Sequence, residues 1–244
     1  SFDLCNVKTA PPIFKGNYIK LFLSLIFNYL KLLFYLPRVF RFFKLEKAIG
    51  ISYIVILKKL YFNAHILKAR NIDWLHFGFG TTALGKEHLG KVIGAKVAVS
   101  YRGFDIGIYP LKKPGCYKLL WNNVDKVHVI SNDILNLLYK KGMPKEILVE
   151  KITPAIDVQF FSNKKNVSNE VIEKINFLTV GRLHWKKGFE ETLKGLQILK
   201  ERGIDFKYVI VGDGNDYERI AFTAFQYDIF DNIEFKGKLT QYDI

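Results

Sequence analysis

The chain has 244 residues, of which 49% are aliphatic, aromatic or cysteine and 25% are charged. This composition supplies apolar material for one large domain or two smaller ones, and it excludes a wholly disordered chain. The two cysteines, Cys5 and Cys116, are too few for a disulfide framework or a structural zinc site. The net charge of +14 indicates an anionic partner: membrane headgroups, nucleic acid or phosphorylated substrates.

Residues 18–48 form a basic, aromatic segment near the amino-terminal end. Its first part, residues 18–36, is strongly apolar, and its polar side chains recur at steps of three or four. This spacing predicts a helix with one narrow polar stripe, which Pro37 ends or kinks. The polar residues of the stripe are Lys20, Ser24, Asn28 and Lys31.

The pattern has three interpretations. The segment is either a buried helix of a globular domain, a helix that lies in a membrane interface, or a helix that spans the membrane. Lys20 and Lys31 inside the segment argue against a span. Residues 1–70 carry twelve Lys or Arg against only Asp3 and Glu46, which suits an anionic membrane surface. The first two alternatives remain open.

Beyond Arg70, short apolar runs alternate with helical patterns, which indicates an α/β fold with a parallel sheet. The polar stretch 162–174 is the expected linker between two Rossmann-like domains, residues 1–161 and a truncated unit, residues 175–244. The strands are predicted at 73–77, 96–101, 126–130, 147–152, 175–180, 206–211 and 232–235. The helices are predicted at 82–93, 131–142, 187–202 and 216–227.

The strongest chemical motif is the stretch from Gly181 to Gly188, where a strand runs into a loop with several cations and then into a helix. Arg182 supplies a planar fork for a phosphate and Lys187 a point charge. A helix N-terminus adds unpaired N–H groups and a positive dipole end. The loop therefore suits a diphosphate, with a solvated basic loop as the alternative.

A second glycine turn follows the next strand. Gly212 and Gly214 flank Asp213, and either direct ligand contact or a simple tight turn explains them. Because the carboxyl ends of parallel strands share one edge of a sheet, we expect this turn to lie beside the Arg182 loop.

In the first unit, Arg102 and Asp105 follow the strand 96–101, where they face a crevice or form a local surface ion pair. His76 lies at the end of its own strand, shortly before Gly78. This pattern fits a structural role and a functional role of His76 equally well.

Several chemistries lack their signature in this sequence. It has no zinc-ligand spacing, no Gly-x-Ser-x-Gly elbow and no Walker loop. No nucleic-acid-binding motif accompanies the basic charge, so we expect no nucleic-acid partner.

Taken together, the motifs resemble the retaining glycosyltransferases of the GT-B fold, in particular the large family 4 that builds bacterial exopolysaccharide and lipopolysaccharide. The resemblance covers roughly residues 73–244. The matching stretches are 76–78, 100–105, 129–131, 154–160, 181–183 with 187–188, 211–214 and 233–237.

The resemblance implies roles on the donor side. Arg182 and Lys187 would hold the donor diphosphate and stabilise the leaving nucleotide, with no metal or other cofactor. The co-substrate would be a UDP- or GDP-linked sugar. The further donor-binding residues would be Gly181, Gly212, Gly214, Lys236 and Gly237.

On the acceptor side, the resemblance implies catalytic positions for Arg102 and Asp105 and acceptor-side positions for His76 and Gly78. Arg102 stands where many family members carry a His that touches the donor sugar. Because of this departure, the resemblance does not carry the family's histidine–sugar contact over to Arg102.

The resemblance also implies that the chain is the middle of a longer enzyme. The family's glycine-rich loop would precede Ser1, and its paired glutamates would lie beyond Ile244, so we expect little or no activity from this chain alone. The expected reaction moves a sugar from a nucleotide donor to a growing, lipid-linked cell-surface glycan at the cytoplasmic, inner face of the cell membrane. The alternatives are a GT-B nucleotide-sugar epimerase and a basic membrane-associated binding module or degenerate remnant without catalysis.

Overall fold

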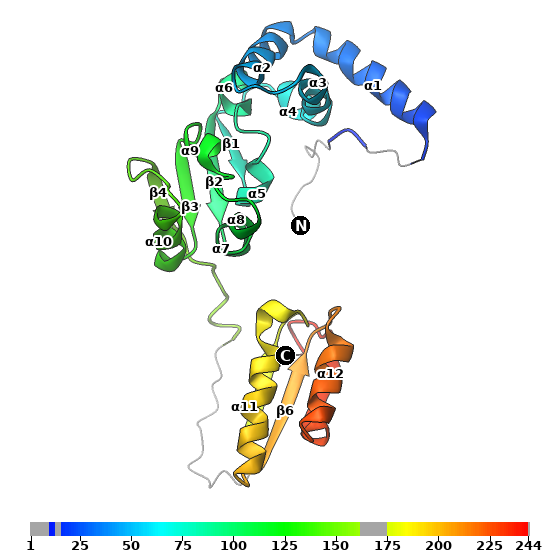
Figure 1. Ribbon diagram of the computed structural model, residues 1–244, viewed down its shortest axis with the longest axis vertical. Helices are drawn as coiled ribbons and strands as arrows, with labels where there is room; N and C mark the ends of the chain where they lie inside the picture. The colour runs from blue at the N-terminus through cyan, green and yellow to red at the C-terminus, as the bar shows by residue number, and fades with distance from the viewer. Residues whose placement is uncertain (1–9, 13–15, 162–174, 244) are drawn as a thin grey trace. The chain divides into compact units, whose positions relative to one another are not determined.

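The computed structural model describes residues 10–12, 16–161 and 175–243, and the chain divides into two compact units, residues 1–160 and 161–244 (Figure 1). Each unit has its own parallel sheet. The expected linker, residues 162–174, lies outside the described residues.

Unit 1 begins with four helices, all of which precede the first strand of its sheet in the chain (Figure 1). Its shared core includes Leu32, Phe42, Ile56 and Leu67, which are nearly or fully buried. The helices of this layer are α1 (Tyr18–Leu33), α2 (Leu36–Ala48), α3 (Tyr53–Phe62) and α4 (Ala64–Leu67). Pro37 lies in the first turn of α2, where its missing N–H leaves no helical bond unmade, so it begins a helix as well as separating two.

The sheet of unit 1 has four parallel strands in the order β1-β2-β3-β4. Its core face carries Val97, Val99 and Tyr101 of β2, which alternate with the more polar side chains of the other face as the strand period requires. The strands are β1 (Trp74–Phe77), β2 (Lys96–Tyr101), β3 (Lys126–Val129) and β4 (Leu148–Lys151). The helices are α5 (Gly80–Ala83), α6 (Leu89–Ile93), α7 (Phe104–Gly107), α8 (Tyr109–Lys112), α9 (Lys118–Trp121) and α10 (Asn132–Lys140).

The predicted helix over residues 82–93 is wrong as a single element. The chain forms α5 and α6 instead, with Gly85 between them at φ +79°. A backbone in this left-handed region does not continue a right-handed helix, and glycine adopts it at no steric cost.

Unit 2 has three parallel strands in the order β5-β6-β7, with helices in the crossovers. Phe189, Leu193, Phe206 and Ile210 belong to its core. The elements are β5 (Ile175–Val180), η1 (Trp185–Lys187), α11 (Phe189–Glu201), β6 (Phe206–Val211), α12 (Tyr217–Gln226), η2 (Phe230–Asn232) and β7 (Ile233–Gly237). The four-stranded and three-stranded parallel sheets confirm the α/β fold class.

Candidate functional site

The glycine loops of unit 2 meet at the carboxyl edge of its sheet. The N–H of Gly181 donates to the carbonyl of Val211 at 2.9 Å, and the N–H of Gly212 donates to the carbonyl of Gly237 at 2.8 Å. Three stretches that are far apart in sequence therefore lie side by side, as the parallel order of the strands requires.

Gly212 and Gly214 allow the two loops to touch through their backbones. A Cβ on Gly212 would lie 1.9 Å from the carbonyl oxygen of Gly181, and one on Gly214 would lie 2.1 Å from that of Leu183. Gly212 also has φ +146°, which side chains rarely tolerate. Both glycines thus have a packing role, and they set the distance between the loops whether or not a ligand touches them.

A hollow of about 390 Å³ opens where these loops meet. Arg182 lies on its wall, and so does Lys238, which the sequence motifs missed because they ended at Gly237. The signal was its place directly after β7, at the edge where the other two loops also emerge. The lining residues are Val180, Gly181, Arg182, Val211, Gly212, Asp213, Lys238 and Leu239.

The cations at this edge are available to a ligand. Arg182, Lys187 and Lys238 are exposed, and none makes a side-chain hydrogen bond or ion pair with another residue that the structure describes. A Cβ on Gly181 would lie 3.8 Å from the Cε of Lys187, so the Lys187 side chain passes close to the loop that carries Arg182. Such unneutralised positive charge favours an anion. Within the described ranges, no three His, Cys, Asp or Glu side chains group as ligands of a metal ion.

Lys236 differs from these cations because its charge is neutralised. Its Nζ pairs with the Glu234 carboxylate on the same strand, and Lys207 Nζ lies 2.8 Å from the other carboxylate oxygen. The hydrogen bonds from Lys207 and Lys236 lower the pKa of Glu234 to about 2. Lys236 is thus engaged within the strand, while Gly237 sits at the edge with φ +66°.

The expected helix N-terminus behind Lys187 is wrong in its position. Residues 185–187 form a 3₁₀ turn, Gly188 adopts φ +69°, and α11 begins at Phe189. Glu190 and Glu191 occupy the first turn of α11, where their carboxylates already interact with the positive end of the helix dipole. The start of α11 is therefore not a free helix N-terminus, and the positive charge at this edge comes from the side chains of Arg182, Lys187 and Lys238.

In unit 1, Asp105 is a fully buried carboxylate that ties two loops together. It accepts backbone N–H groups of Gly103 at 2.9 Å, Gly80 at 3.0 Å and Arg102 at 3.1 Å. Of the two alternatives for this pair, the surface ion pair is wrong, because the bond comes from the Arg102 backbone and the Asp105 side chain has no exposed area. Asp105 therefore positions the Gly80 and Arg102 loops and does not itself face a substrate, whereas the Arg102 side chain is exposed.

His76 belongs to a row of hydrogen bonds that crosses the sheet of unit 1. His76 Nε2 lies 2.8 Å from Ser100 Oγ, which lies 2.8 Å from His128 Nδ1, and His128 Nε2 lies 3.0 Å from the carbonyl of Ile152. The sequence motifs missed His128, and they included Ser100 only as the first residue of the stretch 100–105, since only the strand register places both in line with His76. Gly78 follows β1, and a Cβ there would meet open space.

Comparisons with known proteins agree with this architecture. Residues 160–244 match the family described as glycosyl transferases group 1. The chain is 31% identical over 166 residues to the putative colanic acid biosynthesis glycosyltransferase WcaL of Escherichia coli K12, and 29% identical to WcaL of Salmonella typhimurium. Each alignment covers 66% of this chain and 40% of the relative, so the chain spans well under half the length of these curated relatives.

Two solved structures show the same fold at low sequence identity. HepE of Anabaena, solved in complex with UDP and glucose, has a TM-score of 0.54 and 13% identity, and the match covers 69% of this chain and 48% of HepE. A glycosyltransferase from Rickettsia africae has a TM-score of 0.53 and 19% identity, covering 78% of this chain and 53% of its own. These likenesses confirm the expected GT-B fold.

Proposed function

We propose that the chain is part of a group 1 glycosyltransferase of the GT-B fold, in the branch that makes exopolysaccharide and lipopolysaccharide, and that it binds a nucleotide-sugar donor at the carboxyl edge of β5–β7. The reaction would transfer the sugar from the nucleoside diphosphate to a glycan acceptor.

One observation carries this proposal: a hollow with Arg182 on its wall, flanked by Lys187 and Lys238, in which none of the three cations has a partner among the described residues. A diphosphate supplies the missing negative charge, and the Arg182 guanidinium is shaped to bind two of its oxygens. As the glycosidic bond breaks, charge grows on the leaving diphosphate. Arg182 and Lys187 would stabilise it there, without a metal ion, in a reaction that retains the anomeric configuration.

The acceptor is proposed from the relatives. WcaL is named for colanic acid biosynthesis, and we propose a growing, lipid-linked glycan as the acceptor of this enzyme, at the cytoplasmic face of the cell membrane. We also propose that the chain alone turns over poorly, since it spans 40% of these relatives. Multiple turnovers by the purified 244-residue chain with UDP- or GDP-sugars and membrane lipid extract would overturn this last point.

A thermal-unfolding series tests donor binding directly. A ligand that binds only the folded state stabilises it by RT ln(1 + [L]/Kd), about 2.7 kcal/mol at a hundredfold excess over Kd. UDP or GDP is expected to raise the melting temperature of the chain, while uridine and guanosine, which lack the diphosphate, are expected to leave it unchanged. Equal effects of the diphosphate and the free nucleoside would contradict the proposed role of the cations.

A further inference from the structure

Helix α1 turns its polar side chains towards the protein. Ser24 Oγ lies 2.8 Å from the Tyr61 hydroxyl, and Asn28 Nδ2 donates to the carbonyl of Ser24 at 2.9 Å. Lys68 Nζ donates to Asn28 Oδ1 at 3.3 Å, and Asn28 is only 9% exposed. The middle of the polar stripe therefore faces α3 and α4 rather than the solvent.

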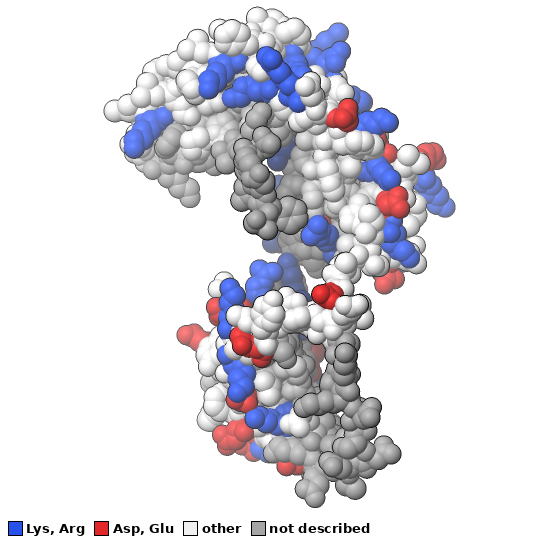
Figure 2. All heavy atoms as spheres, turned by 180° about the vertical axis from the view of Figure 1, so that it is seen from behind, with Lys and Arg blue, Asp and Glu red and all other residues white. Residues whose placement is uncertain are grey.

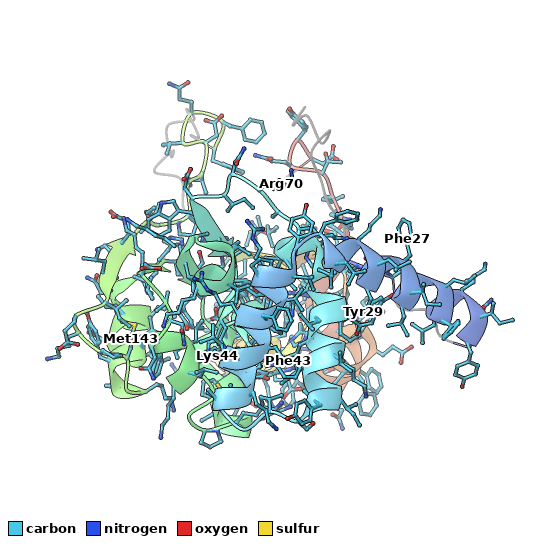
Figure 3. All side chains as sticks on the ribbon, turned by 90° about the horizontal axis from the view of Figure 1, so that it is seen from above. Phe27, Tyr29, Phe43, Lys44, Arg70 and Met143 are labelled. Atoms are coloured by element: carbon cyan, nitrogen blue, oxygen red, sulfur yellow. The ribbon has the colours of Figure 1, made fainter. Side chains whose placement is uncertain are left out.

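The opposite side of α1 is apolar and open. We call its six side chains the apolar face of α1, and each is between 42% and 62% exposed. They are Phe22, Leu23, Ile26, Phe27, Leu30 and Leu33. Figure 3 shows Phe27 pointing away from the neighbouring helices, whereas Tyr29 points towards α3 and donates its hydroxyl to the carbonyl of Leu57 at 2.8 Å. A helix on a protein surface in water buries its apolar side and exposes its polar side. Since α1 does the opposite, its apolar face needs an apolar partner.

The charge around this face is of one sign. Residues 16–70, all of which the structure describes, contain ten Lys or Arg and a single carboxylate, Glu46. Glu46 is fully buried and is held by Lys59 Nζ at 2.6 Å and His88 Nδ1 at 3.0 Å, so it offers no negative charge to the surface. Lys and Arg side chains gather over this helical end of unit 1 (Figure 2).

Two of these cations lie directly on exposed aromatic rings. Lys31 Nζ lies 3.9 Å from the ring centre of Phe27, and Lys47 Nζ lies 4.1 Å from that of Tyr53. Cationic heads at the border of an apolar surface, with their stems along it, suit the level of lipid headgroups. Lys31 therefore borders the apolar face of α1 through Phe27, and Lys47 lies on an exposed ring of α3 in the same helical layer.

These observations choose between possible partners. A second copy of this surface would bring positive charge against positive charge, whereas an anionic bilayer offers both acyl chains and negative headgroups. No single helix among the described residues is long and apolar enough to cross a membrane. The pair α1 and α2 passes that test only together, across a bend of 106°.

We propose that the apolar face of α1 docks on the surface of an anionic phospholipid bilayer. Helix α1 lies in the plane of the membrane, its apolar face enters the boundary between headgroups and acyl chains, and the surrounding Lys and Arg bind lipid phosphates. Docking uses no residue of the β5–β7 edge, so a failure of nucleotide binding leaves this proposal standing, and the reverse also holds.

Co-sedimentation with vesicles tests the proposal on the intact 244-residue chain. Phosphatidylcholine vesicles that contain phosphatidylglycerol are expected to retain the protein at low salt, and pure phosphatidylcholine vesicles are expected to retain far less. The double substitution Phe22→Ser and Phe27→Ser is expected to abolish retention. Its matched control, Phe222→Ser with Phe225→Ser, removes two phenylalanines of α12 that are 61% and 71% exposed, and is expected to bind as the unaltered chain does.

The charges are tested separately. Lys31→Gln is expected to weaken retention about fivefold at low salt, and Lys194→Gln, which removes an exposed lysine of α11, is expected to have no effect. Equal binding by the α1 and α12 variants, or no retention by anionic vesicles, would overturn the proposal. So would a dimer in lipid-free solution that the α1 substitutions dissociate, because the face would then belong to a second copy. Circular dichroism checks that every variant is folded.

Discussion

At the scale of single residues, Gly212 shows how an apparent ligand motif also sets the architecture. The glycine pattern was compatible with a tight turn or a ligand contact. The parallel strand order predicted that this turn lies beside the Arg182 loop, but not how closely the two backbones approach each other. The structure adds a backbone contact, since a Cβ on Gly212 would lie 1.9 Å from the oxygen of Gly181. The glycine is therefore required by loop packing, which no local pattern specifies.

We expect Gly212→Ala to destabilise unit 2 by about 1–3 kcal/mol, because both the clash and the φ of +146° must be relieved. The matched control is Gly195→Ala, in the exposed interior of α11, where a Cβ meets open space. Alanine there is expected to stabilise the chain by about 0.5–1 kcal/mol. Urea unfolding followed by circular dichroism measures both changes, and the same sign for the two variants would contradict the packing role.

Asp105 gives a second prediction at this scale. Asp105→Ala leaves three backbone N–H groups without their acceptor in a buried place, so we expect a loss of about 2–4 kcal/mol in the stability of unit 1. Arg102→Ala removes only an exposed side chain and is expected to change stability by less than about 0.5 kcal/mol. If melting curves showed equal losses for both variants, the side chains would form the ion pair that the structure lacks.

At the scale of secondary-structure elements, the apolar runs at residues 96–101, 175–180 and 206–211 predicted their strands to the residue. Short buried strands bounded by turns leave little freedom in their limits. The four-residue helices α4, α5 and α7–α9 were not predicted, because a helical period needs a window of about 11 residues to become visible. The register between strands was equally hidden, and with it the row from His76 to His128.

That row fixes the protons on two histidines. The carbonyl of Ile152 can only accept, so His128 Nε2 must donate, and neutral His128 Nδ1 then accepts from the hydroxyl of Ser100. Ser100 Oγ in turn accepts from His76 Nε2–H. Imidazole ¹⁵N shifts are expected to show the Nε2–H form for both neutral histidines. Ser100→Ala is expected to release His76 from this form at a cost of about 1 kcal/mol in stability. An Nδ1–H form of His128 in the unaltered chain would contradict the row.

At the scale of the whole molecule, unit 1 and unit 2 each present a basic surface, and the basic surface of unit 1 also carries exposed apolar side chains. The ten cations of residues 16–70 belong to the helical layer that also carries the apolar face of α1, whereas Arg182, Lys187 and Lys238 gather at the β5–β7 edge of unit 2. The net charge of +14 predicted an anionic partner but did not say that the two units present separate basic surfaces. That separation follows from the fold, because the parallel order of β5–β7 collects residues that lie far apart in the chain.

The central claim is that the β5–β7 edge binds a nucleoside diphosphate through Arg182. The most direct measurement is an isothermal titration of UDP and GDP into the unaltered chain and into Arg182→Ala, with Arg202→Ala as the control of equal charge change at the far end of α11. Removing a charge-assisted hydrogen bond costs about 1.5–3 kcal/mol. We therefore predict that the better of the two nucleotides binds about 10- to 100-fold more weakly to Arg182→Ala and unchanged to Arg202→Ala. Equal affinity of all three proteins for the diphosphate would contradict the account.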